Sequence, residues 1–205
     1  MDKESLPKEI ITQRTVVRRT TADDIAQFDA WPGYPWPFEC FDINAQARNM
    51  TEQRWWTLID EPDFCHYSVV LPATDEVIGL HVFLGIDCEK RLIANMGIRI
   101  RPDVCDQGYG RESLQPLLKA VLNTGMGSIR LDVAATNARA VRCYEQCGMR
   151  IVDEFWQDGV GPDDPHEPKW APLMPHLRRE GNAWMVRFYW MEISAEATQR
   201  DKTTA

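Results

Sequence analysis

The sequence contains no apolar run long enough to form a membrane-spanning helix. Its longest nearly continuous apolar stretch, residues 77–86, is interrupted by Gly79 and His81, whereas a span needs roughly 20 apolar residues. Residues 1–10 are rich in charged side chains and lack the hydrophobic segment of a secretory signal. We therefore expect a cytoplasmic protein that has no membrane partner.

An excess of basic residues is also absent. The 205 residues include 23 Lys and Arg against 31 Asp and Glu, which gives a net charge of −8. An acidic protein repels a phosphate backbone, so nucleic acid is not an expected partner. The chain is 44% hydrophobic, which supports a packed core and excludes a disordered protein or a coiled coil. At this length we expect one domain over residues 1–205.

The cysteines lack the spacing of a metal site or of a disulfide framework. None of the six forms a Cys-x-x-Cys pair, and no paired histidine tract accompanies them. Cys143 and Cys147 are four residues apart on one face of an expected helix, and we interpret them as core thiols. We therefore expect no metal cofactor.

The local hydrophobic patterns alternate between strand and helix along the chain. Apolar runs of strand type predict strands over residues 14–19, 65–71, 76–86, 92–101, 129–135, 149–156 and 183–193. Caps and helical spacing predict helices over residues 25–30, from Thr51 to Pro62, over 108–123 and over 138–146. Pro116 lies inside the third helix and predicts a kink or a late start of the regular helix.

The strand over residues 92–101 alternates apolar and basic residues at its end. Ile98 and Ile100 occupy one face, and Arg99 and Arg101 occupy the other. This period of two predicts a half-buried strand.

The segment from Ile98 to Arg111 runs from a strand through a loop with two glycines into a helix. Gly108 and Gly110 allow close backbone approach to a ligand, and the unpaired N–H groups at the helix start suit a diphosphate. A P-loop is excluded because Arg111 and Glu112 replace the required Lys and Ser or Thr. A dinucleotide fingerprint fits poorly, because its third glycine is missing and no further βαβ units follow. A helix that merely follows two glycines remains an alternative.

Two motifs in series resemble the GNAT superfamily of acyl-CoA N-acyltransferases. The family's pyrophosphate motif, Gln/Arg-x-x-Gly-x-Gly/Ala, corresponds to residues 105–110, which read Cys-Asp-Gln-Gly-Tyr-Gly. The next motif, Asn-x-x-Ala/Ser-x-x-x-Tyr-x-x-x-Gly-Phe, is matched by Asn137, Ala140, Val141, Tyr144 and Gly148, with Met149 in place of Phe. The resemblance covers roughly residues 14–193. It implies an α+β GNAT-like fold with a mixed, mostly antiparallel sheet of about seven strands, splayed between the fourth and fifth and flanked by about four helices.

The resemblance also implies an acetyl-CoA-dependent N-acetyltransferase. The amine of a small-molecule or protein acceptor attacks the thioester directly in a ternary complex. Tyr144 is implied to protonate the departing thiolate, and a core aromatic is its other interpretation. A bulge in the fourth strand is implied to free backbone groups for the pantetheine arm. The implied cofactor-binding residues are Ile98, Arg99, Ile100, Cys105, Asp106, Gln107, Gly108, Tyr109, Gly110, Arg111, Asn137 and Tyr144.

Two positions depart from the family pattern. Cys105 stands where the family has Arg or Gln, which removes a side-chain contact to the phosphates. Asn95 stands where many members carry a glutamate base, and an amide cannot take the proton of the amine. The base is therefore unassigned, with these candidates: Glu39, Asp42, His81 and Glu154. A non-catalytic acyl-CoA-binding or regulatory module, or a nicotinamide enzyme that uses the glycine loop, is an alternative function.

Two segments are expected to form the acceptor site on the far side of the split sheet. Residues 31–41 hold aromatic side chains among prolines, and the long connection over residues 158–181 adds carboxylates, His166 and Trp170. Aromatic faces and carboxylates together suit a cationic amine. The alternative is that the aromatic residues complete the core and that the insertion is a surface loop or a homodimer contact. Beyond residue 193 we expect a polar tail.

Overall fold

The computed structural model of the chain describes residues 3–38 and 61–196. The helix expected from Thr51, the aromatic residue Phe41 and the base candidates Glu39 and Asp42 lie outside these residues. Within the described ranges, no helix is long and apolar enough to cross a membrane.

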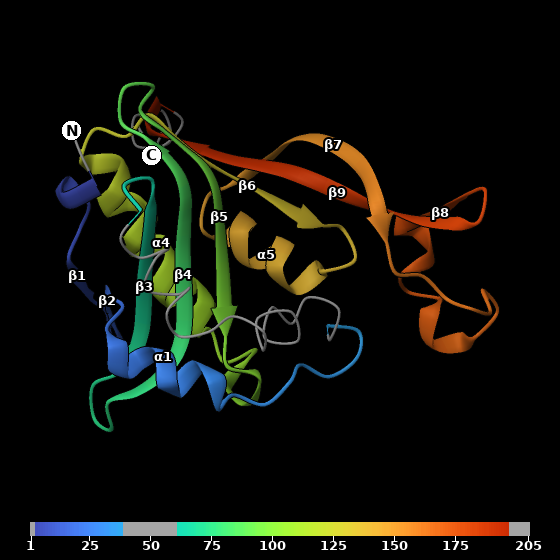
Figure 1. The fold of residues 1–205 in the computed structure, drawn as a ribbon, viewed down its shortest axis with the longest axis horizontal. Coiled ribbons are helices and arrows are strands. Elements are labelled where there is room, and N and C mark those ends of the chain that lie inside the picture. Colours follow the sequence, from blue (N-terminus) through green and yellow to red (C-terminus); the bar gives the residue numbers. More distant parts are fainter. Residues whose placement is uncertain (1–2, 39–60, 197–205) are drawn as a thin grey trace.

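The chain forms a mixed, mostly antiparallel sheet, as predicted (Figure 1). Its strands are β1 Glu9–Ile11, β2 Val16–Arg19, β3 Phe64–Leu71, β4 Glu76–Asp87, β5 Leu92–Ile100, β6 Ser128–Ala134, β7 Arg150–Gly159, β8 Leu177–Glu180 and β9 Ala183–Ser194. They lie in the order β1-β2-β3-β4-β5-β6-β9-β7, and β8 pairs with β9. The predictions missed β1 and β8, which have 3 and 4 residues. Such short segments carry little periodic signal of their own.

The sheet opens between β5 and β6. These parallel strands pair only at Leu92↔Ser128 and Ile93↔Ile129, after which no further pairs form. The predicted splay is therefore confirmed. The resemblance implied a bulge in β5. The β4–β5 ladder is interrupted at Gly85 and Ala94, which form no pair, and its register is the same on both sides of this gap. Each strand therefore has one unpaired residue there, whereas the implied bulge would place an extra residue in β5 alone.

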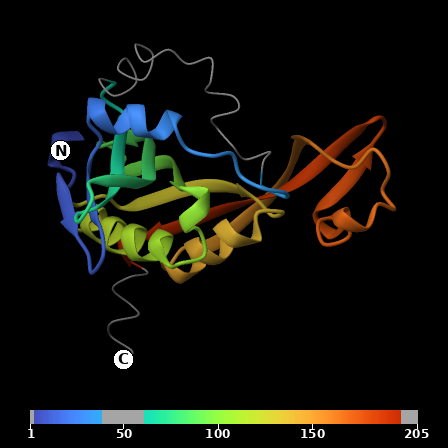
Figure 2. The same ribbon diagram turned by 90° about the horizontal axis from the view of Figure 1, so that it is seen from below.

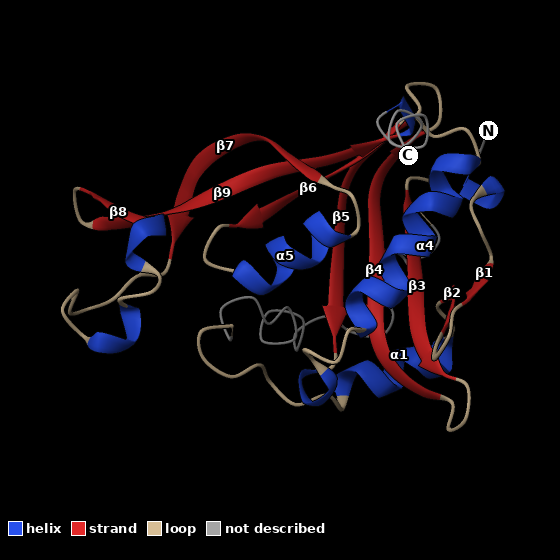
Figure 3. Cartoon of the chain, turned by 180° about the vertical axis from the view of Figure 1, so that it is seen from behind, coloured by secondary structure: helices blue, strands red, loops and turns tan. Residues whose placement is uncertain are grey.

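The helices form a layer on each side of the sheet. Helices α4 (Tyr109–Asn123) and α5 (Ala138–Gln146) cover one face, and α1 (Ala22–Asp29) lies over the other (Figures 2 and 3). Short 3-10 turns are η1 Lys3–Ser5, η3 Pro102–Val104, η4 Pro168–Trp170 and η5 Met174–His176.

Helix α4 runs without interruption through Pro116, so the predicted late start is wrong. The neighbouring Leu114, Leu117 and Leu118 are fully buried in the main core. Burial of each leucine stabilises the helix by about 1.5–3 kcal/mol, and together they outweigh the hydrogen bond that the proline cannot donate.

Arg99 departs from the predicted pattern of β5. Only 8% of its surface is exposed, and its guanidinium lies 5.2 Å from the ring centroid of Trp31 and 5.6 Å from that of Tyr34. The aromatic segment after α1 covers the arginine face of the strand at this position, so β5 is more deeply buried here than a half-buried strand. A period of two shows which residues share a face, but not what lies over that face.

The connection between β7 and β9 is more regular than predicted. It holds η4, η5 and β8, and it extends from the body of the protein as an arm (Figure 1). Trp170, Leu177 and Val186 form a small apolar cluster with Ala134 of β6. The ring centroid of Trp36 lies 4.5 Å from that of Trp170, so the aromatic segment after α1 meets the insertion as expected.

Candidate functional site

Two glycines shape the start of α4. Gly108 is the N-cap residue and has a φ of 86°, a left-handed conformation that residues with a side chain rarely adopt. A Cβ atom on Gly110 would lie 3.2 Å from Cys143 Sγ on α5, so this glycine allows the two helices to pack closely. Both glycines face a cavity, toward which the unpaired N–H groups of the first helical turn are directed.

The cavity has a volume of about 310 Å³ and lies between β5, α4 and α5. The predicted site residues that line it are Ile98, Arg99, Ile100, Cys105, Asp106, Gly108, Tyr109, Gly110, Arg111 and Asn137. Two predicted residues, Gln107 and Tyr144, are not part of the lining. The lining residues that sequence reasoning missed are Tyr34, Phe38, Val104, Arg139, Ala140, Arg142, Cys143 and Gln146.

The sequence carries a signal for four of these missed lining residues. Arg139, Arg142, Cys143 and Gln146 follow Asn137 at helical spacing, so they share the face of α5 that carries the motif. Tyr34 and Phe38 belong to the aromatic segment that was expected at the acceptor site. Their place in this cavity depends on how the segment after α1 crosses the sheet.

The cavity is positively charged in a protein whose net charge is negative. Arg99, Arg111, Arg139 and Arg142 line it, and Asp106 is the acidic residue among the lining residues. Arg139 Nη1 lies 3.9 Å from a carboxylate oxygen of Asp106. An excess of guanidinium groups beside a helix N-terminus favours an anionic ligand such as a phosphate or diphosphate.

The backbone of β5 faces the split at two predicted positions. Arg101 N–H donates to the Ile78 carbonyl at 2.8 Å, which makes Arg101 a hydrogen-bonded position of the antiparallel β4–β5 pair. Hydrogen-bonded positions alternate along such a pair. The N–H and C=O groups of Ile98 and Ile100 therefore point away from β4 and toward the split.

Tyr34 occupies one of these backbone groups. Its hydroxyl donates to the Ile100 carbonyl, and the Cys105 thiol lies 3.4 Å from the same oxygen. Burial raises the pKa of Tyr34 to about 12, so the hydroxyl stays protonated and remains a donor at neutral pH. The aromatic segment after α1 is thereby tied to the strand that lines the cavity.

Tyr144 lies on α5 behind the cavity wall, and 5% of its surface is exposed. Burial raises the pKa of its hydroxyl, the neighbouring Cys143 raises it further, and a hydrogen bond from the Ile98 N–H opposes both effects. Tyr144 is therefore protonated at neutral pH and meets the backbone of β5 at the split. This position is compatible with a proton donor, and its burial is equally that of a core residue.

Asn137 caps α5 and also lines the cavity. Its Oδ1 accepts a hydrogen bond from the Ala140 N–H at 3.2 Å, so the cap interpretation is confirmed. One lone pair of Oδ1 and the amide nitrogen remain for other contacts.

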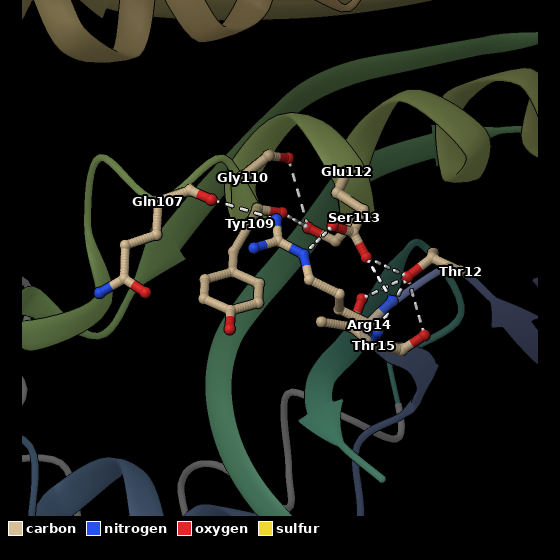
Figure 4. Close-up of polar contacts among 8 residues, drawn as sticks. All are labelled: Thr12, Arg14, Thr15, Gln107, Tyr109, Gly110, Glu112 and Ser113. Carbon is tan, nitrogen blue, oxygen red and sulfur yellow. Dashed lines mark hydrogen bonds and ion pairs between the residues drawn. The ribbon is translucent and has the colours of Figure 1, made fainter.

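The glycine loop is held from outside by the turn between β1 and β2 (Figure 4). Arg14 Nε donates to Glu112 Oε2 at 2.6 Å, and Arg14 Nη2 donates to the Gln107 carbonyl at 3.1 Å. The Arg14 guanidinium also lies 4.2 Å from the ring centroid of Tyr109. Partial burial opposes ionisation of Glu112, but hydrogen bonds from Thr12 and Arg14 lower its pKa.

The same close-up explains the absence of Gln107 from the cavity. Its side-chain amide points away from the Arg14 network (Figure 4) and donates to the Asp103 carbonyl at 3.4 Å. The structure therefore brings the Gln107 backbone, but not its side chain, into the support of the loop.

The two described base candidates lie away from the cavity. His81 is fully buried, its Nε2 lies 2.9 Å from Ser113 Oγ, and burial lowers its pKa to about 3. A neutral, enclosed imidazole is a poor proton acceptor. Glu154 pairs with Tyr189 in the β7–β9 ladder. Neither His81 nor Glu154 lines the cavity.

Cys143 on α5 lies close to Cys147, the C-cap residue of that helix. Cys143 and Cys147 are free thiols, and a hydrogen bond between them lowers the pKa of Cys143 and raises that of Cys147. Among the described residues, no group of three or more His, Cys, Asp or Glu side chains is placed to hold a metal ion.

Comparison with known proteins places the chain among acetyltransferases. The sequence model of the Acetyltransferase (GNAT) family matches residues 30–149, whereas no curated protein matches the chain. The spermidine/spermine N-acetyltransferase SpeG from Vibrio cholerae has a similar structure, with a TM-score of 0.63 and 17% identity over 92% of this chain and 96% of that one. A GNAT-family acetyltransferase from Bacillus anthracis has a TM-score of 0.60 and 18% identity over 92% of this chain and 99% of that one.

Proposed function

The chain belongs to the GNAT acetyltransferase family, and from this premise we propose that it transfers the acetyl group of acetyl-CoA to a primary amine. The amine attacks the thioester directly while both substrates are bound. The observation that carries the proposal is the arginine-lined cavity at the start of α4, which adjoins the open edge of β5. Acetyl-CoA carries a diphosphate, which suits the arginine-lined cavity, and an extended amide arm, which suits the open edge of β5.

Each end of acetyl-CoA has a proposed partner in the cavity. The N–H groups after Gly108, together with Arg111 and Arg142, are proposed to bind the diphosphate. The backbone groups of Ile98 and Ile100 that face the split are proposed to bind the amide arm. Cys105 supplies no charge to the phosphates, and the nearby guanidinium groups compensate for this departure from the family pattern.

Tyr144 is proposed as the acid of the reaction. Its hydroxyl is protonated and meets the Ile98 N–H at the split. The departing thiolate would take the phenolic proton, which avoids release of a charged sulfur into a partly apolar site.

The acceptor is proposed to be a cationic amine. The aromatic segment after α1 contacts the insertion through Trp36 and Trp170. Exposed carboxylates of the insertion, including Asp163 and Asp164, lie shortly before Trp170 in the sequence. Aromatic faces and carboxylates bind ammonium groups by cation–π contact and ion pairing. The neighbouring SpeG structures come from an enzyme named for spermidine and spermine, which makes polyamines the first acceptors to test.

Thiol release tests the proposal. The purified chain, incubated with acetyl-CoA and a panel of amines that includes spermidine and spermine, should release coenzyme A in proportion to acetylated amine. The melting temperature, measured with and without acetyl-CoA, reports binding separately. If acetyl-CoA binds but none of the amines causes thiol release, the chain would instead be a non-catalytic acyl-CoA-binding module.

A further inference from the structure

A carboxylate lies across the split from Asn95, the residue that replaces the family's glutamate base. Asn95 Nδ2 on β5 donates to Asp132 Oδ1 on β6 at 2.9 Å. The last backbone pair between these strands is Ile93↔Ile129. The hydrogen bond therefore spans the split just beyond the point where the backbones separate.

Both side chains point to the face of the sheet opposite α4 and α5. Leu131 and Val133, the neighbours of Asp132, are buried in the main core with the leucines of α4. Successive side chains of a strand point to opposite faces, so Asp132 points away from those helices. Ile98 packs against the same core. Asn95 is an odd number of positions from Ile98 along β5, so the Asn95 side chain points to the opposite face, the same face as Asp132.

The hydrogen bond orients Asp132 and leaves half of the carboxylate available. Within the described part of the chain, Oδ1 accepts from Asn95, whereas Oδ2 has neither a hydrogen bond nor an ion pair. Asp132 is partly exposed. It is also close enough to Tyr144 that, after burial and Cys143, its charge contributes to the raised pKa of that phenol. A proton acceptor and a proton donor thus flank the split from opposite faces.

We propose that Asp132 is the general base of the acetyl transfer and that Asn95 positions it. This inference rests on the proposed function. The proposed base lies on β6 instead of β5, and the Asn95 amide, at the position of the family's glutamate, holds the Asp132 carboxylate by a hydrogen bond.

The proposed steps balance as follows for an ammonium acceptor. Asp132 Oδ2 takes one proton from the ammonium group, and the freed nitrogen lone pair forms a C–N bond with the thioester carbon. The C–S bond then breaks, and sulfur takes the Tyr144 proton. The second proton, shed by the new amide nitrogen, restores the Tyr144 hydroxyl through solvent, and Asp132 releases its proton to solvent.

Asp132→Asn tests the inference, because it keeps an oxygen for Asn95 and removes only the charge. With an amine that the wild type acetylates, kcat should fall by at least about a hundredfold, whereas the KM for acetyl-CoA and the melting shift caused by acetyl-CoA should stay unchanged. Asp153→Asn is the matched control. Asp132 on β6 and Asp153 on β7 both pair with Trp190 of the strand between them, β9, so their side chains lie on the same face of the sheet. The Asp153→Asn variant should keep wild-type turnover.

Rescue separates a base from a structural role. Asn95→Glu in the Asp132→Asn background returns a carboxylate to the split and should recover at least tenfold of the lost kcat. Wild-type turnover by Asp132→Asn, or loss without recovery in the double variant, would overturn the assignment and leave the transferase function standing. Absence of turnover by the wild type with every amine would overturn both.

Discussion

Filling the space beside Gly110 should abolish acetyl-CoA binding. A Cβ at this position lies 3.2 Å from Cys143 Sγ, 3.6 Å from Ile100 Cγ1 and 3.7 Å from Ile98 Cδ1. The two further methyl groups of Gly110→Val must therefore enter the cavity or displace α5. Overpacking of this kind costs about 1–3 kcal/mol, so the apo variant should melt at a lower temperature than the wild type.

The ligand-induced shift is the decisive quantity. At a hundredfold excess over its Kd, acetyl-CoA adds about 2.7 kcal/mol to the free energy of unfolding. A chain of this size gains about 2–4 °C in Tm for each kcal/mol, so the wild type should gain about 5–11 °C. Gly110→Val should gain less than about 1 °C at the same concentration.

Gly97, a glycine on β5, provides the control for this measurement. Among the residues that the structure describes, no atom lies within 4 Å of a Cβ built on Gly97, and Gly97 does not line the cavity, so Gly97→Val adds the same side chain without filling it. It should keep the full acetyl-CoA shift in differential scanning fluorimetry. A shift of wild-type size in Gly110→Val would refute the placement of acetyl-CoA beside α4.

Three further predictions concern the acid, the loop support and an ion pair at α1. Tyr144→Phe should keep the acetyl-CoA shift but lower kcat by about a hundredfold; an unchanged kcat would remove Tyr144 as the acid. Arg14→Met, which keeps the apolar stem but breaks the bonds to Glu112 and to the loop carbonyl, should weaken acetyl-CoA binding by about tenfold, roughly 1.4 kcal/mol, as measured by calorimetry; equal affinity would show that the loop needs no support. Asp24 is buried, and although burial raises its pKa, hydrogen bonds from Arg18, Thr21 and Ser68 lower it overall. A lowered folded-state pKa gives stability that is present above the unfolded pKa of about 4 and is lost as pH falls through the folded value. Urea unfolding should therefore show that Asp24→Asn is less stable than the wild type at pH 7 and that the difference shrinks below about pH 4; a constant difference would contradict the linkage.

The support of the glycine loop explains how a distant part of the chain can affect cofactor binding. Arg14 belongs to the turn before β2, yet it contacts the ring of Tyr109 and the carbonyl before Gly108. A loop held from outside loses less conformational freedom when a ligand binds. Substitutions in this N-terminal turn are thus expected to act on affinity rather than on the chemical step.

Local features of the site could be read from the sequence. Gly108 and Asn137 act on their own helix ends, through a positive φ and an N-cap. Such features depend on neighbours within a few residues, so spacing alone reveals them. The splay between the strands was inferred from the family resemblance, and the pairing of β5 with β6 agrees with it.

Other features required the tertiary structure. The period of two put Arg99 on the basic face of β5, but only the fold shows that a segment about 65 residues earlier in the chain covers it through Trp31 and Tyr34. Asn95 was recognised as a missing base, but only the approach of β6 shows that Asp132 bonds to it.

The sequence by itself determined the order of elements, the helix caps and the glycine loop, because each depends on short-range backbone geometry and hydrophobic period. Only the tertiary structure decided which side chains meet across the split, since those contacts join residues tens of positions apart. Asp132 and Asn95 are 37 positions apart, and Arg14 and Glu112 are 98 apart. Asp132 and Asn95 meet where the two halves of the sheet separate, and Arg14 meets Glu112 because the turn between β1 and β2 lies against the start of α4. No local pattern records either contact.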